Sequence, residues 1–209
     1  MFRITDVVKH LAITNVVIYA LSWILFQENR NILALYYPAS EHFQPYQLVT
    51  HIFMHADVSH LFFNMLTLIF LGPTVEALWG SRRFLFYYLF AGFGAIIAHL
   101  IIWYFSVQSI DPIFYESAMN NVNSYVLGAS GAVYGITAAF GLLFPERELQ
   151  LLFIPVPIKA KYLAFGLILL DSTLGISGRS TGVAHFAHLG GAFAGAFLIM
   201  YWQKYGSKL

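Results

Sequence analysis

Long apolar segments with few charges constrain this chain more than any other feature of its sequence. Of its 209 residues, 59% are hydrophobic and only 10% are charged, whereas a soluble domain carries about 25% charged residues. A helix that crosses a bilayer needs roughly 20 predominantly apolar residues. Six segments approach that length: 10–26, 57–78, 84–105, 127–144, 160–176 and 183–203. We therefore predict an all-α membrane protein, a six-helix bundle forming a single membrane domain over residues 1–209.

The rest of the composition narrows the possible partners. The net charge of +1 gives no reason to expect a nucleic-acid partner, and the absence of cysteine excludes disulfides and thiolate chemistry. No small-residue cleavage site follows the first apolar run, so we expect a retained helix and not a cleaved signal peptide. We expect the lipid bilayer as a partner and no cofactor; the oligomeric state is not specified by the sequence.

Basic residues predict the orientation in the membrane, because they concentrate on the cytoplasmic side. With the N-terminus inside, nine of them fall on the inner side: Arg3, Lys9, Arg82, Arg83, Arg147, Lys159, Lys161, Lys204 and Lys208. Only Arg30 and Arg179 fall outside. We therefore expect both termini to be cytoplasmic, most simply in the cell membrane. The segments 57–78, 127–144 and 183–203 then all run from outside to inside.

Counting from the inner ends places three polar residues at one depth. Ser130 lies fifteen residues before Pro145, which is about 22 Å of helix in an apolar slab about 30 Å thick. The same separation recurs in the two parallel segments, from Asn64 to Trp79 and from His188 to Gln203. Ser130, Asn64 and His188 are therefore predicted to lie together, roughly 8 Å below the outer surface. His60 lies one turn above Asn64 on the same helix face.

The segment that carries Ser130 is predicted to be a broken span. Gly128 and Gly131 flank the serine, and a loop-like run over 120–124 precedes it. We expect the helix to begin near Ser130, below the membrane surface. Irregular backbone at that depth is tolerated only when it is buried in protein or lines a water-filled cavity, and the helix N-terminus would direct unpaired N–H groups toward that cavity.

These residue types are suited to nucleophilic hydrolysis. Ser130 would be the nucleophile, and His188 the base that takes its proton and later protonates the leaving amine. The Asn64 amide, the His60 imidazole and the Ser130 N–H would bind the oxyanion. No acidic residue shares this depth on the three parallel segments, so we expect a Ser–His dyad without a carboxylate. Tyr134, one turn below Ser130, would orient the His188 ring.

Small residues are spaced so that two of these helices can approach closely. Gly131 and Gly135 follow Ser130, and Gly191 and Gly195 follow His188, each pair in a small-xxx-small pattern. Such faces allow close contact between membrane helices. The hydrogen bond between serine and histidine requires that contact.

The residues in this order resemble the rhomboid family of intramembrane serine proteases. The motifs are His60-Leu61-Phe62-Phe63-Asn64, Gly128-Ala129-Ser130-Gly131 with Tyr134, and His188 followed by Gly191 and Gly195. The resemblance covers nearly the whole chain. It implies that Ser130 and His188 form the catalytic dyad and that His60 and Asn64 help to bind the oxyanion, with Tyr134, Gly128, Gly131, Gly191 and Gly195 in support.

The resemblance also implies roles outside the motifs. The segment 160–176 and the cap loop 172–182 would gate lateral access of a transmembrane substrate, and Glu76 matches a structural acidic position. Many members carry a Trp-Arg pair late in the first loop, where this chain has Tyr46-Gln47. The resemblance therefore does not define how the loop over 27–56 docks.

The same residues allow other interpretations. A lone serine at a helix end is usually a cap or packing residue. His51, His55 and His60 allow a metal site, but no acidic cluster accompanies them and the His-Glu-x-x-His pattern is absent; we expect no metal. His185 competes with His188 as the base, although the glycine spacing favours His188. His99 and Asp171 are assigned packing or gating roles.

The resemblance predicts a serine endopeptidase that hydrolyses peptide bonds in or near transmembrane segments of membrane proteins, close to the outer face. Transmembrane proteins would be its substrates. The alternative is a non-catalytic protein of the same fold that binds membrane clients. A transporter is disfavoured, because no internal repeat or chain of paired ionisable groups is found.

Overall fold

Long helices dominate the structure, a computed structural model that describes residues 3–25, 30–108, 124–150, 156–177 and 184–206. The helices are α1 (Asp6–Leu25), α2 (Gln47–Thr50), α3 (Val58–Trp79), α4 (Ser81–Gln108), α6 (Ser130–Leu143), α7 (Ala160–Ile176) and α8 (His185–Tyr205). Two 3-10 helices, η1 (Arg30–Leu33) and η2 (His51–Phe53), lie in the first loop. The strands are β1 (Leu35–Tyr36), β2 (Tyr125–Val126), β3 (Glu148–Leu149) and β4 (Ile158–Lys159). Each predicted apolar segment matches a long helix whose ends lie within four residues of the predicted ones.

Several of these helices have the length and apolarity of membrane spans. Among the described residues, α1, α3 and α4 are long and apolar enough to cross a bilayer, and α6 is a shorter apolar helix of 14 residues. The shortness of α6 follows from its late start at Ser130, three residues after the beginning of the predicted segment. The mostly helical fold with several apolar helices agrees with the predicted membrane bundle.

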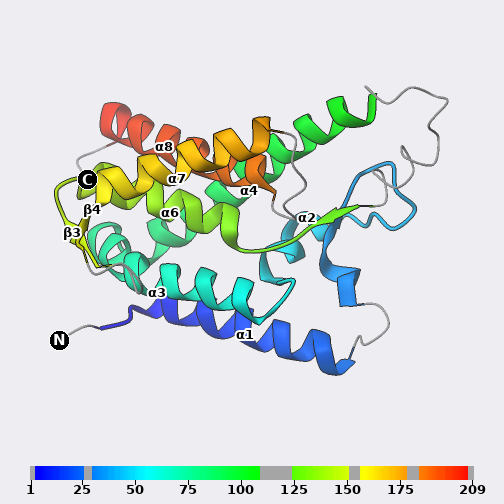
Figure 1. Ribbon diagram of the computed structural model, residues 1–209. Coiled ribbons are helices and arrows are strands. Elements are labelled where there is room, and N and C mark those ends of the chain that lie inside the picture. Colours follow the sequence, from blue (N-terminus) through cyan, green and yellow to red (C-terminus); the bar gives the residue numbers. More distant parts are fainter. Residues whose placement is uncertain (1–2, 26–29, 109–123, 151–155, 178–183, 207–209) are drawn as a thin grey trace.

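Helix α6 lies at the centre of the bundle. It contacts α3, α4, α7 and α8, and Figure 1 shows it between α3 on one side and α7 and α8 on the other. Ten of its 14 residues are buried. Glycine and alanine make up six of the 14 residues of the helix, and small side chains let neighbouring backbones approach closely. The position of α6 therefore brings Ser130 within reach of several helices.

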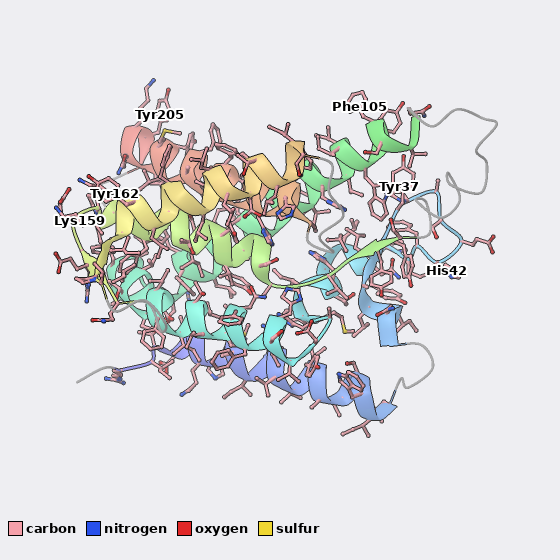
Figure 2. All side chains as sticks on the ribbon, viewed as in Figure 1. Tyr37, His42, Phe105, Lys159, Tyr162 and Tyr205 are labelled. Carbon is pink, nitrogen blue, oxygen red and sulfur yellow. The ribbon has the colours of Figure 1, made fainter. Side chains whose placement is uncertain are left out.

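The helices α3, α6 and α8 run in the same direction, as the depth comparison requires. All three run toward the end of the molecule that holds β3 and β4, and α1 also begins at that end (Figure 1). Figure 2 shows Lys159, Tyr162 and Tyr205 at this end and Tyr37, His42 and Phe105 at the opposite end. The starts of α3, α6 and α8, with their polar residues, therefore point toward the end occupied by the first loop.

The side chain of Gln47 holds the first loop together. Gln47 is one of the two residues that stand where many rhomboid proteins carry the Trp-Arg pair. This side chain is buried, and its oxygen accepts hydrogen bonds from the backbone N–H groups of Tyr36 (3.3 Å) and Gln44 (3.1 Å). Its nitrogen donates to the carbonyls of Ile32 (3.2 Å) and His42 (3.0 Å). One neutral amide therefore joins four separate points of the loop.

A short antiparallel pairing connects this loop to the segment that leads into α6. Leu35 of β1 lies opposite Val126 of β2, and Tyr36 lies opposite Tyr125. The rings of Tyr36 and Tyr125 also pack against each other at 5.4 Å between centroids. The first loop thus fixes the approach of the chain to Ser130.

At the opposite end, the connection between α6 and α7 carries an exposed charge cluster. Strand β3 pairs with β4, and the Glu146 carboxylate accepts hydrogen bonds from Lys159, at 2.8 Å, and from Lys161. These bonds lower the pKa of the Glu146 carboxyl to about 2. The cluster is therefore ionised at neutral pH, although exposed ion pairs contribute little to stability.

Glu76 joins three helices at the same end. Its buried carboxylate accepts hydrogen bonds from the backbone N–H groups of Val7 (3.1 Å) and Val8 (3.0 Å), in the first turn of α1. The hydroxyls of Thr5 (2.5 Å) and Ser81 (2.7 Å) also donate to it. A carboxylate at a helix N-terminus satisfies orphan N–H groups and interacts favourably with the helix dipole. Glu76 therefore caps α1 from α3 and holds the start of α4, consistent with the structural role expected for it.

Replacing Glu76 by Ala is expected to lower the free energy of unfolding by about 2–4 kcal/mol, because buried donors lose a charged acceptor. Denaturation of the purified protein in detergent micelles measures this loss. The matched control is Glu146→Ala, which removes an exposed carboxylate from the same end and should leave the unfolding midpoint nearly unchanged. Equal midpoints for the two variants would contradict the capping role of Glu76.

Candidate active site

The start of α6 is formed by an unusual backbone turn at Gly128. This glycine has a φ of 120°, a conformation that costs a side-chain-bearing residue strain. A Cβ at this position would also lie 2.8 Å from Cε1 of His60. The Gly128 N–H donates to the His51 carbonyl at 2.9 Å, so the first loop supports the turn. The helix then begins at Ser130, as predicted from the flanking glycines.

Ser130 and His188 meet across α6 and α8. The distance from Ser130 Oγ to His188 Nε2 is 2.8 Å, the usual length of a hydrogen bond involving a hydroxyl. His188 is 9% exposed, and Ser130 is partly buried. Of the two histidines that competed for this place, His188 is the one that reaches the serine, while His185 lies one turn earlier on α8.

Glycines permit the close approach of the two helices. A Cβ on Gly191 would collide with the carbonyl group of Gly131, and a Cβ on Gly195 would collide with the hydroxyl of Tyr87. That hydroxyl donates to the Gly135 carbonyl at 2.7 Å. The predicted small-xxx-small faces are therefore in contact, and α4 supports the contact through Tyr87.

Replacing Gly191 by Ala is expected to push α8 away from α6. The new methyl group would meet the backbone of Gly131, which has no flexible end that can move aside. We expect the free energy of unfolding to fall by about 1–3 kcal/mol and any Ser130-dependent activity to fall with it. Gly166→Ala on α7 is the matched control, because a Cβ there meets nothing within 4 Å. Denaturation in micelles compares the two, and equal effects would contradict the close-contact explanation.

Tyr134 packs against the ring face of His188. Its ring stacks on the His188 imidazole with 4.2 Å between centroids and 15° between planes. The ring is therefore in the position expected of a residue that orients His188, and it limits rotation of the imidazole.

His60 and Asn64 line the same cavity as Ser130 and His188, a space of about 1060 Å³. The Asn64 amide nitrogen donates to the His60 carbonyl at 2.9 Å. Nδ1 of His60 accepts the Ala56 N–H at 3.4 Å, so a neutral His60 carries its proton on Nε2. Nε2, together with Cε1, is on the edge of the ring that faces Gly128. The structure thus brings all four predicted site residues to one cavity.

The histidines of the first loop have local partners. His51 is buried, and its Nδ1 donates to the Gln47 carbonyl at 2.9 Å. Burial lowers the pKa of His51 to about 4, so its ring is neutral. His55 meets His60 edge to face at 5.0 Å between ring centroids. His51 is therefore hydrogen-bonded within the first loop.

The expected absence of a carboxylate beside His188 is wrong. Asp171 reaches His188 from α7, with 3.3 Å between Oδ2 and Nδ1, and its Oδ1 contacts Nδ1 of His185. Helix α7 is antiparallel to the three helices whose depths were compared, so its acidic residue was not included. The same count would have placed it near that depth: Asp171 lies eleven residues from Ala160, the predicted inner end of α7, about 16 Å and within side-chain reach of the level of Ser130.

An apolar helical bundle with polar residues gathered at an internal cavity defines an integral membrane protein with a buried polar site. A family model described as the Rhomboid domain matches residues 42–205. The chain belongs to the rhomboid family.

Several curated proteins are similar to the chain. "Rhomboid protease AarA" of Providencia stuartii is 29% identical over 148 residues, which cover 69% of this chain and 51% of that protein. "Rhomboid-like protease 3" of Toxoplasma gondii is 25% identical over 201 residues, which cover 93% of this chain and 68% of that protein. "Rhomboid protease GluP" of Bacillus subtilis (strain 168) is 31% identical over 153 residues, which cover 73% of this chain and 25% of that protein. The chain thus spans about half of the first relative and a quarter of the third.

Proposed function

We propose that this protein is an intramembrane serine endopeptidase that hydrolyses peptide bonds in or near transmembrane segments of other proteins. The observation that carries the proposal is the 2.8 Å contact between Ser130 Oγ and His188 Nε2, at the edge of a cavity that His60 and Asn64 also line. A nucleophile within hydrogen-bond reach of a base is the arrangement that covalent catalysis requires. Membership of the rhomboid family, and the protease names of its relatives, agree with it.

The first half of the reaction forms an ester between the substrate and Ser130. The Ser130 hydroxyl gives its proton to His188 Nε2 while Oγ attacks the scissile carbonyl carbon, and the carbonyl oxygen becomes an oxyanion. When the intermediate collapses, the C–N bond breaks and Nε2 delivers the proton to the leaving amine. In the second half, water attacks the ester and gives its proton to His188. The ester bond breaks, and Oγ recovers that proton.

Hydrogen-bond donors around Ser130 would stabilise the oxyanion. The backbone N–H of Ser130 lies in the first turn of α6, where N–H groups have no partner within the helix. Asn64 carries a second amide proton besides the one given to the His60 carbonyl. Nε2–H of His60 faces the same turn. Each such donor is worth roughly 3 kcal/mol in the transition state.

We further propose that the long helices α1, α3, α4, α6, α7 and α8 cross the cell membrane, with both termini in the cytoplasm. The end of the molecule that holds Lys159 and the start of α1 would then be cytoplasmic (Figure 2). The reaction centre would lie nearer the outer face, and the cavity would supply water to it.

Helix α7 is suited to gate the access of a substrate from the lipid. Only three of its 17 residues are buried, Ala160, Ala164 and Asp171, in contrast to the heavily buried α6. A helix with few buried contacts separates from its neighbours at low cost. Of the predicted cap loop over 172–182, residues 172–176 belong to the end of α7, and residues 178–182 lie outside the described residues. Because helical carbonyls are hydrogen-bonded, the preferred substrate would unwind easily near the scissile bond.

Reconstitution of the purified protein in liposomes tests the proposal. A model transmembrane substrate with small or helix-breaking residues near its outer end should be cut, and mass spectrometry of the products locates the bond. A serine-directed fluorophosphonate should label the protein. A non-catalytic client-binding protein would retain the substrate without cutting it and would not react with the probe; that pair of results would refute the proposed activity.

A further inference from the structure

The buried face of α7 carries a single acidic side chain, and no role in the proposed reaction has been given to it. Asp171 is 3% exposed and directly follows the apolar run Leu167–Leu170 of α7. An acidic group among apolar helices is costly unless it is paired, so its presence by itself indicates a function. The side chains around Asp171 therefore indicate its role.

Two histidine side chains converge on the Asp171 carboxylate. Nδ1 of His188 lies 3.3 Å from Oδ2, and Nδ1 of His185 contacts Oδ1. A carboxylate with two donors directed at it is stabilised in its ionised form, and an ionised carboxylate only accepts hydrogen bonds. Both imidazoles must therefore present an N–H at Nδ1.

This requirement determines the state of the nitrogen that faces Ser130. A neutral imidazole carries one proton, so a proton on Nδ1 of His188 leaves Nε2 with a free lone pair. Nε2 is the atom that lies 2.8 Å from Ser130 Oγ. The opposite tautomer would place a proton between Nε2 and the serine and would prevent Nε2 from acting as a base. The separation of 3.3 Å is at the long end for a hydrogen bond, as is common before a substrate binds.

We infer that Asp171 is a positioning residue for His188. It selects the Nδ1–H tautomer, fixes the ring together with Tyr134, and balances the positive charge that His188 acquires when it takes the serine proton. The inference deepens the proposed protease function and rests on it for its effect on turnover. Because Asp171 comes from α7, the base is held in its active tautomer only while α7 is docked against α8.

His185 supports the carboxylate and does not replace His188. It lies 7% exposed on α8, one turn before His188, and engages the second carboxylate oxygen. Its contact keeps the other oxygen, Oδ2, turned toward His188. In this arrangement the two histidines have different roles although they share one acceptor.

The same three side chains are of types that bind metal ions, with ligand atoms within 4.8 Å of one another. A zinc ion there would take Nδ1 of His188 as a ligand and would displace the hydrogen bond to Asp171. The positioning role and a metal site are therefore mutually exclusive, and the experiment below distinguishes them.

The direct test is the tautomer of His188 in the folded wild-type protein. In micelles, ¹⁵N NMR of histidine-labelled protein, with the His188 signals assigned by their loss in His188→Gln, should show Nδ1 protonated and Nε2 unprotonated. In Asp171→Asn the population should shift toward the Nε2–H form. This readout requires no catalysis, so it still decides the inference if the protein proves to cut nothing. An Nε2–H tautomer in the wild type would overturn the inference.

Kinetics give the second readout. Asp171→Asn should lower kcat by about 100-fold or more while KM changes by less than about threefold, because the tautomer affects the chemical step and not substrate binding. Asp171→Glu, which keeps the charge, should recover at least about tenfold of that loss. The control is Ser172→Ala, whose hydroxyl donates to the Ile168 carbonyl on the same helix and should have wild-type kcat.

Three results would overturn the inference. The first is an Asp171→Asn variant that is folded and has the same kcat as the wild type. The second is an equal loss in Asp171→Glu and Asp171→Asn. The third is activity that disappears on dialysis against a chelator and returns with Zn²⁺, which would assign the three side chains to a metal.

Discussion

Ser130→Ala is expected to abolish cleavage of a transmembrane substrate and labelling by a fluorophosphonate. The change removes Oγ, the one atom that forms a covalent bond to the substrate in the proposed reaction, and leaves the helix start otherwise unaltered. Loss of a serine nucleophile lowers kcat by about 10⁴-fold or more. Hydrolysis in liposomes and in-gel detection of the probe both measure the effect.

The matched control for this change is Ser22→Ala. Ser22 is a buried serine of a different helix, and its hydroxyl donates to the Tyr19 carbonyl at 2.7 Å on α1. It should retain cleavage and labelling. Probe labelling that persists in Ser130→Ala would show that a different residue is the nucleophile.

His188→Gln is expected to reduce cleavage as severely as the loss of Ser130. Glutamine cannot take up the serine proton, so Ser130 remains a weak nucleophile. The two residues act as one unit, and the double variant Ser130→Ala/His188→Gln should therefore be no less active than either single variant. Measurement of all three rates on one substrate tests this non-additivity.

His185→Gln provides the comparison, because it removes the neighbouring histidine and leaves the contact between His188 and Ser130 in place. It is expected to keep measurable cleavage. If His185→Gln abolishes cleavage and His188→Gln does not, the roles of the two histidines are reversed.

Much of this arrangement could be predicted because it depends on distances along single helices. Rise per residue and bilayer thickness are nearly constant, so the level of Ser130, Asn64 and His188 follows from counting residues. Glycine spacing then indicates which faces meet, as the contact of Gly191 with Gly131 confirms. The start of α6 at Ser130 follows from the flanking glycines.

The features that could not be predicted depend on contacts that no periodic pattern along the sequence indicates. Nothing in the residues around Gln47 indicates that one amide will reach four points of the first loop. Nor does the sequence show that Asp171 faces α8, because the rotation of α7 about its axis is determined by packing against neighbouring helices. The two-residue strands β1 and β2 carry too few residues for a periodic pattern.

The cap that Glu76 places on α1 has a consequence for biogenesis. Glu76 lies 68 to 71 residues after the groups that it binds at the start of α1, so these groups are synthesised well before their capping carboxylate. The start of α1 therefore has no carboxylate partner until α3 has been synthesised, and the cap ties the beginning of the chain to a segment made later.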